Sequence, residues 1–421
     1  MKTEVRYRYL PAAIVLLLAG ALSPAAEKAR RIRPADTLPK TTPWDLKALS
    51  APPAYTWSEG GPKGVRSLTY RGQAYKGKPT RVFAYYATPG TLAGDRSKDK
   101  NLPAMVLVHG GGGKAFDAWA RLWAKRGYAA IAMDLGGCGP GKKRLEDGGP
   151  DQGDKTKFGA IAGPAKDQWT YHAVANVILA HSLIQSLPEV DADRTALTGI
   201  SWGGYLTCIV AGLDNRFKAA VPVYGCGFLH DNSCWLGRFK GMSADDRAKW
   251  VRLWDPSMYV GSAAMPMLFV NGGQDFAYPP DSHARTVALV KAPGRNIRFS
   301  PKLPHGHIFD RPKAIEVFID HHLKGGVALP RVGAPEAADG KVTASVTAST
   351  KLTSAALCYT ADALPGNPRR RKWTEKSATV EGSRIAALAP PADATIWFLT
   401  VTDERNAIVS STLVFPKNSK P

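Results

Sequence analysis

The stretch Thr198-Gly199-Ile200-Ser201-Trp202-Gly203-Gly204 decides the fold, because it places a serine between two different structural patterns. Residues 194–198 before it are β-prone, and residues 204–212 after it are small and apolar at helical spacing. Gly-x-Ser-x-Gly in this setting is typical of a nucleophile elbow, a turn so sharp that both flanking positions must lack bulk. A serine hydroxyl is a good nucleophile only beside a base, so the elbow predicts partners elsewhere in the chain.

A glycine cluster follows another buried-strand pattern upstream of the serine. The apolar run 104–108 leads into His109 and then into four glycines, residues 110–113. Glycines let backbone N–H groups turn inward and approach a bound molecule closely. We expect an oxyanion hole formed by the N–H of Trp202 and that of Gly111 or Gly112, each donor lowering a barrier by roughly 3–4 kcal/mol. The alternative is a flexible glycine-rich surface turn.

A carboxylate and a histidine follow in the order that such a serine requires. Asp275 comes just after the strand-like run 266–271, where an acid would orient a histidine. Turn or helix capping is its structural alternative, and Asp281 and Asp310 fit the strand-end position less well. The run from residue 298 predicts another strand, and His305 and His307 lie in the loop after it.

His305 is the expected base, because it comes first after that strand, and His307 remains the alternative. The order Ser…Asp…His along the chain is the one found in proteins with the strand–elbow–helix arrangement. Strand and helix patterns alternate between residues 102 and 326, which predicts a mostly parallel sheet with helices on both faces.

Beyond residue 326 the pattern changes to short strands separated by turn residues, which predicts a small β-sandwich of immunoglobulin or fibronectin type. Trp373 or Trp397 there would bind glycan if exposed, but we expect a packing module. The predicted organisation is a signal peptide, an N-terminal leader, a catalytic domain, a linker and the β-sandwich, at residues 1–26, 27–64, 65–326, 327–338 and 339–421.

Three stretches carry a family resemblance: residues 198–207, residues 223–227 (Val-Tyr-Gly-Cys-Gly) and residues 304–307 (Pro-His-Gly-His). In these the chain resembles secreted bacterial α/β-hydrolases of the acetylxylan-esterase-like and dienelactone-hydrolase-like family, which are related to the catalytic domain of prolyl oligopeptidases. The resemblance implies an α/β-hydrolase fold, a serine esterase acting on acylated carbohydrate such as xylan, and an insert over the site at residues 228–265. Dienelactone hydrolases proper use a cysteine nucleophile, whereas this elbow carries Ser201.

Two other functions compete with the esterase. A peptidase of the prolyl oligopeptidase type fits the elbow equally well, but only about 100 residues precede His109, too few for a propeller of four-stranded blades. A catalytically inactive, carbohydrate-binding relative would have lost a member of the serine–histidine–acid set, and each is present in the sequence.

The N-terminus predicts export. Basic residues precede the apolar run 10–22, and a small-residue cleavage site follows it at residues 23–26. This run is too short to span a membrane comfortably, so we expect a secreted or periplasmic protein. Five cysteines are present, of which Cys226 and Cys234 either pair or stay free.

The net charge of +21 indicates either general basicity or attraction of anionic polysaccharide. No nucleic-acid motif accompanies the charge, and the densest cluster, residues 369–372, is interpreted as a solvated loop. No Cys/His spacing indicates a metal site, and the expected chemistry needs no cofactor. The expected partner is therefore an acylated carbohydrate or another small ester, and the oligomeric state is not predicted.

Overall fold

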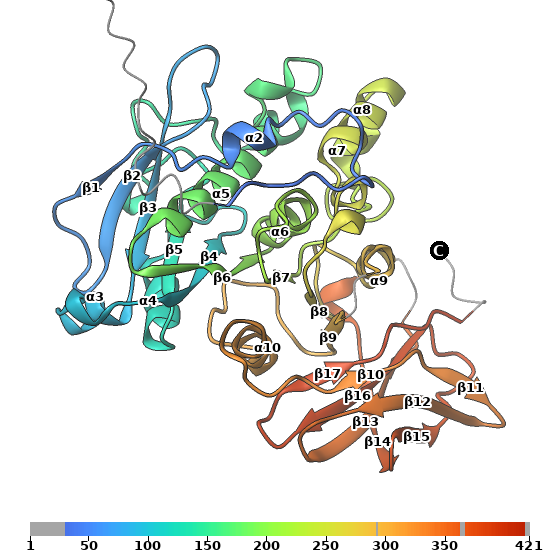
Figure 1. Cartoon of the computed structure of the whole chain (residues 1–421). Coiled ribbons are helices and arrows are strands. Elements are labelled where there is room, and N and C mark those ends of the chain that lie inside the picture. Colours follow the sequence, from blue (N-terminus) through green and yellow to red (C-terminus); the bar gives the residue numbers. More distant parts are fainter. Residues whose placement is uncertain (1–29, 292–293, 363–366, 417–421) are drawn as a thin grey trace, which may run out of the picture.

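The computed structural model describes residues 30–291, 294–362 and 367–416. An α/β part and a C-terminal antiparallel β-domain pack against each other in it (Figure 1). The expected signal peptide, residues 1–26, lies outside the described residues.

The α/β part is built on one nine-stranded mixed sheet with the order β1-β2-β3-β5-β4-β6-β7-β8-β9. The strands from β5 to β9 in this order are parallel. Strands β1, β2 and β3 pair antiparallel with one another, and β3 pairs antiparallel with β5. This is the arrangement of an α/β-hydrolase, as the alternating sequence pattern predicts. The strands are β1 Tyr55–Ser58, β2 Arg66–Arg71, β3 Arg81–Ala87, β4 Leu102–Val108, β5 Ala129–Met133, β6 Val190–Ile200, β7 Ala219–Val223, β8 Leu268–Gly272 and β9 Asn296–Ser300.

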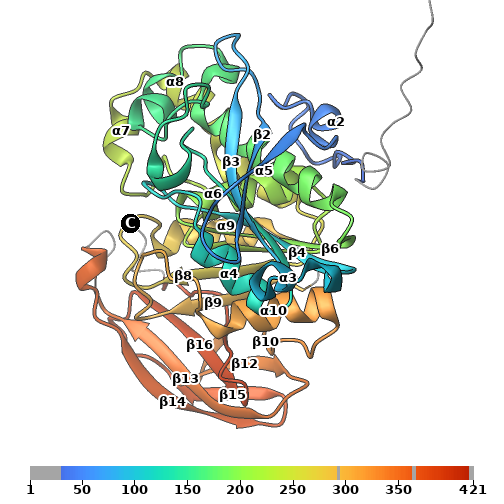
Figure 2. The same cartoon turned by 90° about the vertical axis from the view of Figure 1, so that its left-hand side faces the viewer.

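Helices cover both faces of this sheet (Figure 2). Helices α4 and α10 pack on one face, and α5 and α6 pack on the other. The segment between β7 and β8, where the resemblance implies an insert, carries α7 and α8. The helices are α2 Leu46–Leu49, α3 Pro89–Ala93, α4 Asp117–Lys125, α5 Trp169–Ser186, α6 Trp202–Leu213, α7 Leu236–Lys240, α8 Ala244–Trp254, α9 Pro280–Leu289 and α10 Lys313–Lys324.

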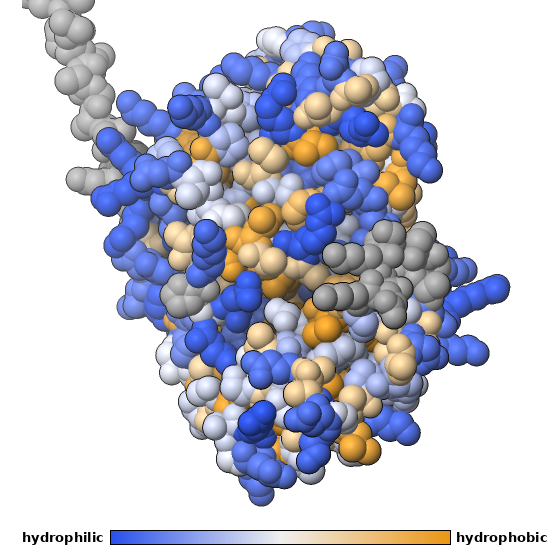
Figure 3. All heavy atoms as spheres, turned by 90° about the vertical axis from the view of Figure 1, so that its right-hand side faces the viewer, coloured by the Kyte–Doolittle hydropathy of each residue, from blue (hydrophilic) through white to orange (hydrophobic). Residues whose placement is uncertain are grey.

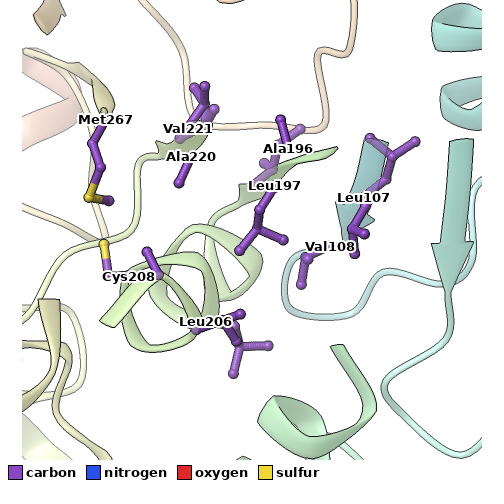
Figure 4. Packing of buried hydrophobic residues seen from close by; sticks show 14 of the residues in the cluster. Leu107, Val108, Ala196, Leu197, Leu206, Cys208, Ala220, Val221 and Met267 are labelled. Atoms are coloured by element: carbon purple, nitrogen blue, oxygen red, sulfur yellow. The ribbon is translucent and has the colours of Figure 1, made fainter. Parts of the chain in front are cut away.

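The core lies between the sheet and these helices. Figure 4 shows side chains from three adjacent strands and from α6 gathered there, among them Leu107, Leu197, Val221 and Leu206. Every residue of α5 is buried, because the sheet covers one side of this helix and other segments of the chain cover the rest. Such packing fixes the two ends of the elbow, the end of β6 and the start of α6.

The N-terminal leader wraps over α5. The Trp44 indole is buried, donates from Nε1 to the Tyr171 carbonyl at 2.9 Å, and contacts the rings of Trp254 and Tyr259. The leader therefore ties α5 to the segment between β7 and β8.

The C-terminal domain is a single antiparallel sheet and not the predicted β-sandwich. Its strand order is β10-β12-β15-β14-β13-β16-β17, with β11 also paired to β12, and its first and last strands approach each other, so the sheet curls into a barrel shape. The strands are β10 Arg331–Val332, β11 Glu336–Ala338, β12 Lys341–Thr347, β13 Leu352–Thr360, β14 Thr374–Glu381, β15 Arg384–Leu388, β16 Ile396–Asp403 and β17 Ile408–Ser410.

The physical reason for the difference is strand β14. Its first half pairs with β13 and its second half pairs with β15, so one strand joins what would be two separate sheets of a sandwich. The run 378–387 contains a hairpin, because Gly382 takes φ +57° and reverses the chain between β14 and β15. Strands β10 and β11 lie within the segment expected to be a linker.

Hydrogen bonds join the C-terminal domain to the edge of the large sheet. The Ser410 hydroxyl accepts from the Phe299 N–H at 3.0 Å and lies 3.2 Å from the Ile297 carbonyl. The Asn296 side chain donates to the Pro330 carbonyl at 2.9 Å. Strand β9, which leads into the histidine loop, is therefore held by the C-terminal domain.

The surface is mixed in character. On the face seen in Figure 3, hydrophilic side chains project from both parts, with smaller hydrophobic areas between them. Within the described ranges, none of the helices combines the length and the apolar character that crossing a membrane requires.

Candidate active site

Ser201 lies on a strained turn between β6 and α6. Its φ is +60° and its ψ is −120°, a conformation that costs an L-residue of order 1–3 kcal/mol. The turn leaves no room for side chains beside it. A Cβ at Gly199 would lie 2.2 Å from the Gly203 carbonyl oxygen, and one at Gly203 would lie 2.0 Å from the carbonyl oxygen of Val108. The two glycines of the motif are therefore required by space.

The structure brings Ser201, His305 and Asp275 into one hydrogen-bonded chain. Nε2 of His305 lies 2.9 Å from the Ser201 hydroxyl oxygen, and Nδ1 lies 2.7 Å from Oδ2 of Asp275. The other oxygen of Asp275 accepts from the N–H groups of Ala277 and Tyr278 at 2.7 and 2.8 Å. Asp275 is fully buried, whereas the His305 side chain is 12% exposed, so the imidazole is accessible from the surface and the carboxylate is not.

Three aromatic rings surround His305. The rings of Tyr224, Phe276 and Tyr278 lie 4.7, 4.9 and 6.2 Å from the imidazole, measured between ring centres. The Tyr224 hydroxyl donates to the carbonyl of Pro304 at 2.7 Å and so fixes the residue before His305. Sequence reasoning did not assign these residues a role, although Tyr224 lies in one of the stretches that carry the resemblance.

His307 has a different place. Its Nε2 accepts a hydrogen bond from the Gly110 N–H at 3.1 Å, so it contacts the glycine loop. Burial, with the nearby His109, His305 and Lys142, lowers the pKa of His307 to about 4, so the ring is neutral and able to accept. This contact joins the histidine loop to the glycine loop, and the sequence spacing gave no signal for it.

The glycine loop is a tight turn anchored by His109. The Gly113 N–H donates to the Gly110 carbonyl at 3.1 Å, and Gly112 takes φ +66° at the turn. Nε2 of His109 accepts a hydrogen bond from the Leu135 N–H at 2.9 Å. The proton of the neutral ring is therefore on Nδ1, which donates to the Gly110 carbonyl at 2.7 Å. Burial lowers the pKa of His109 to about 4, which keeps this arrangement neutral.

The two glycines expected to donate are not equivalent. A Cβ at Gly111 would lie 2.7 Å from the Trp202 ring, whereas one at Gly112 would meet nothing within 4 Å. The glycine nearest the serine is Gly110, where a Cβ would lie 2.9 Å from that of Ser201. Gly111 therefore stays beside the start of α6, and Gly112 lies at the exposed tip of the turn.

The Trp202 side chain connects the elbow with the insert. Its ring centre lies 4.6 Å from that of Trp235 and 5.6 Å from that of Trp169. The ammonium group of Lys157 lies 4.4 Å from the Trp202 ring centre, and burial lowers the pKa of Lys157. The insert, which carries Trp235, thus forms one side of the site.

The other side chains considered from the sequence lie elsewhere. Asp281 accepts from the Asn232 amide, and Asp310 forms an ion pair with Arg311 at 3.6 Å. Trp397 is buried in the C-terminal domain, and the Trp373 indole donates to the Gly273 carbonyl at 3.2 Å. Trp397 is therefore closed to glycan, whereas Trp373 is half-buried at the contact between the two parts of the chain.

The described part of the chain contains no group of three or more His, Cys, Asp or Glu side chains placed to hold a metal ion. All five cysteines are free thiols, so Cys226 and Cys234 do not form a disulfide.

A family model matches the part of the chain that carries the elbow. Residues 64–252, which include the glycine loop and the elbow, match the model described as acetyl xylan esterase (AXE1). Over residues 64–252 the chain is similar to the acetyl xylan esterase family.

Curated relatives include both esterases and peptidases. The chain is 26% identical over 272 residues to "Uncharacterized peptidase YuxL" of Bacillus subtilis, which covers 58% of this chain and 37% of that protein. It is 21% identical over 229 residues to "Acetyl esterase Axe7A" of Xylanibacter ruminicola, covering 51% of each protein. The chain thus spans about a third to a half of these relatives' length.

Solved structures support the fold. The acetyl xylan esterase from Paenibacillus sp. R4 superposes with a TM-score of 0.55 at 22% identity, covering 72% of this chain and all of that one. Acetyl xylan esterase 1 from Thermoanaerobacterium sp. gives a TM-score of 0.52 at 17% identity, covering 70% of this chain and 96% of that one.

Proposed function

We propose that the protein is a serine esterase that removes acyl groups, in the first place acetyl groups, from a polysaccharide such as xylan. The observation that carries the proposal is the hydrogen-bonded chain from Asp275 through His305 to Ser201 at the strained elbow. The match of residues 64–252 to the acetyl xylan esterase family supports an ester as the substrate.

In this proposal Ser201 attacks the ester carbonyl while Nε2 of His305 takes the hydroxyl proton. Asp275 orients the imidazole and stabilises the imidazolium through Oδ2, while two backbone N–H groups hold its other oxygen in place. His305 then gives the proton to the leaving alcohol, and an acyl-enzyme remains. A water molecule, activated by the same histidine, releases the acid and restores Ser201.

The negative charge on the carbonyl oxygen needs backbone donors. The Trp202 N–H begins α6, and the first N–H groups of a helix have no partner within it. We assign the second donor to Gly111, with Gly112 as the alternative, because Gly111 lies against Trp202 and Gly112 lies at the exposed tip. His307 is assigned to position this loop through Gly110 rather than to act as the base.

Peptidase activity is the second candidate, because the sequence is also similar to proteins named as peptidases. The test is to assay the purified protein for acetate release from acetylated xylan and for cleavage of a proline-containing peptide amide. Acetate release without amide cleavage supports the esterase. Amide cleavage without acetate release would contradict the esterase proposal and favour the peptidase. No activity on either substrate would contradict acetylated polysaccharide as the substrate.

We propose that the enzyme is exported, because residues 1–26 carry the pattern of a cleaved signal peptide. Mass spectrometry of the protein recovered outside the cytoplasm is expected to show an N-terminus near residue 27. An intact N-terminus on a cytoplasmic protein would contradict export.

A further inference from the structure

The C-terminal domain reaches the loop that carries Asp275. Arg371 is buried and donates from its guanidinium to the Gly273 carbonyl at 3.3 Å, and the Arg371 carbonyl accepts from the Gln274 amide at 3.2 Å. With the Trp373 indole, three hydrogen bonds thus hold the two residues before Asp275. The basic cluster 369–372 is therefore partly a docking element and not a solvated loop throughout.

This docking places Arg369 at the edge of the active site. Arg369 lies on the short helical turn Pro368–Arg370, which rises from the C-terminal domain toward the α/β part (Figure 2). Its guanidinium carbon lies 4.3 Å from the ring centre of Phe276. The same Phe276 ring is 37% exposed and lies 4.9 Å from the imidazole of His305. One aromatic ring therefore separates the guanidinium from the proposed base.

The charge of Arg369 is not balanced by a carboxylate. Among the described residues no ion pair involves Arg369, and its side chain is exposed. Asp275, the acid of the neighbouring loop, is buried and already bonded to His305. A second exposed cation, Lys142, donates to the Gly112 carbonyl at the glycine loop. One cation thus lies against Phe276 of the acid loop, and another lies against the glycine loop.

The chemistry of Arg369 favours a carboxylate ligand. A guanidinium is planar and carries donors in a fork that matches the two oxygens of a carboxylate. The guanidinium lies over the Phe276 ring, a contact that does not use its N–H donors, so the fork remains available. An arginine that served only for docking would be buried and bonded to backbone, as Arg371 is.

We propose that the C-terminal domain forms one wall of the substrate site, and that Arg369 on it binds a carboxylate group of the ester substrate. This inference rests on the proposed esterase function and deepens it: the preferred substrate carries an acidic group, either on the acyl part or on the sugar that is released.

The test compares matched neutral and acidic esters. For the acyl part, the pair is 4-nitrophenyl acetate and the 4-nitrophenyl monoester of succinic acid. For the alcohol part, the pair is an acetylated methyl xyloside and an acetylated methyl glucuronoside. Each is assayed with wild type, Arg369→Gln and the matched control Arg370→Gln, which removes the neighbouring exposed charge.

We expect Arg369→Gln to lower kcat/KM about fivefold to tenfold for the acidic ester of one pair, mainly through KM, and to change the neutral esters less than twofold. Arg370→Gln is expected to change all four less than twofold. The pair that responds identifies the part of the substrate that carries the carboxylate. Equal losses on neutral and acidic esters, or equal effects of the two variants, would overturn the subsite.

A binding measurement separates this inference from the esterase proposal. If wild type hydrolyses none of the four esters, the proposed function fails, and the subsite is then tested by titrating succinate monomethyl ester and methyl glucuronoside into wild type and Arg369→Gln. Weaker binding to the variant supports the subsite, and equal binding or none overturns it.

Discussion

At the scale of single residues, two histidines separated by one glycine have different partners. His305 contacts the Ser201 hydroxyl and Asp275, whereas His307 accepts from a backbone N–H of the glycine loop. A general base must lie within hydrogen-bond reach of the proton that it removes, and His305 satisfies this condition. His307 instead fixes the loop to which we assign an oxyanion donor.

This difference predicts unequal effects of the two alanine variants. His305→Ala is expected to lower kcat by about 10³-fold or more, because no other base faces Ser201 in the proposed mechanism. His307→Ala is expected to lower kcat by about tenfold, since it loosens the loop but leaves the base. Steady-state kinetics on 4-nitrophenyl acetate checks both. A His305→Ala enzyme that keeps its activity while His307→Ala loses it would contradict the assignment.

At the scale of elements, the elbow depends on how closely β4, β6 and α6 approach one another. A Cβ at Gly203 would lie 2.0 Å from the Val108 carbonyl oxygen, and backbone of a central strand cannot move aside cheaply. The contact that places Ser201 above the sheet therefore excludes every residue except glycine at this position.

Gly203→Ala is accordingly expected to destabilise the fold by about 3 kcal/mol or more and to abolish activity. The matched control is Gly237→Ala, also within a helix, where an added Cβ meets nothing within 4 Å. Thermal unfolding of the two variants beside wild type gives the comparison. Equal Tm values for Gly203→Ala and Gly237→Ala would show that the close packing of the elbow is not required.

The helices and strands differ in how well the sequence predicts them. Parallel strands are buried on both faces, so runs such as 104–108 stand out as apolar, and the elbow motif marks where β6 ends. In the C-terminal domain the sequence does not show which strands pair. The alternation of apolar and polar residues predicts which side chains share a face of a strand, but not which strands lie next to it. The predicted sandwich was therefore wrong, and the hairpin at Gly382 was missed. His305 and His307 stayed open because both follow the same strand.

At the scale of the whole molecule, several buried histidines are held neutral. Burial lowers the pKa of His109 and His172 to about 4 and that of His283 to about 3. The unfolded chain takes up these protons as the pH falls through about 6.5, whereas the folded chain does so only near pH 4 or below. The unfolded state thus binds more protons between these limits, and stability falls as the pH falls.

We therefore expect the Tm to drop by about 10 °C or more between pH 7 and pH 5. His283→Phe tests the cause, because neither ring nitrogen of His283 has a hydrogen-bond partner among the described residues. Differential scanning fluorimetry across this range should give a shallower decline for the variant than for wild type. Parallel curves, or a Tm that rises toward pH 5, would contradict the explanation.

The two parts of the chain act together at this scale. The C-terminal domain holds β9 through Ser410 and the acid loop through Arg371, so it supports the loops of both Asp275 and His305. The family match covers residues 64–252 and leaves this domain outside. Its place beside the site is therefore information that only the structure supplies.

The measurement that tests the central claim most directly is acetate release from acetylated xylan by wild type and Ser201→Ala, with Ser257→Ala in the insert as control. We predict release by wild type and by the control, and a rate lowered by about 10³-fold or more in Ser201→Ala. A Ser201→Ala protein that released acetate at the wild-type rate would contradict the account.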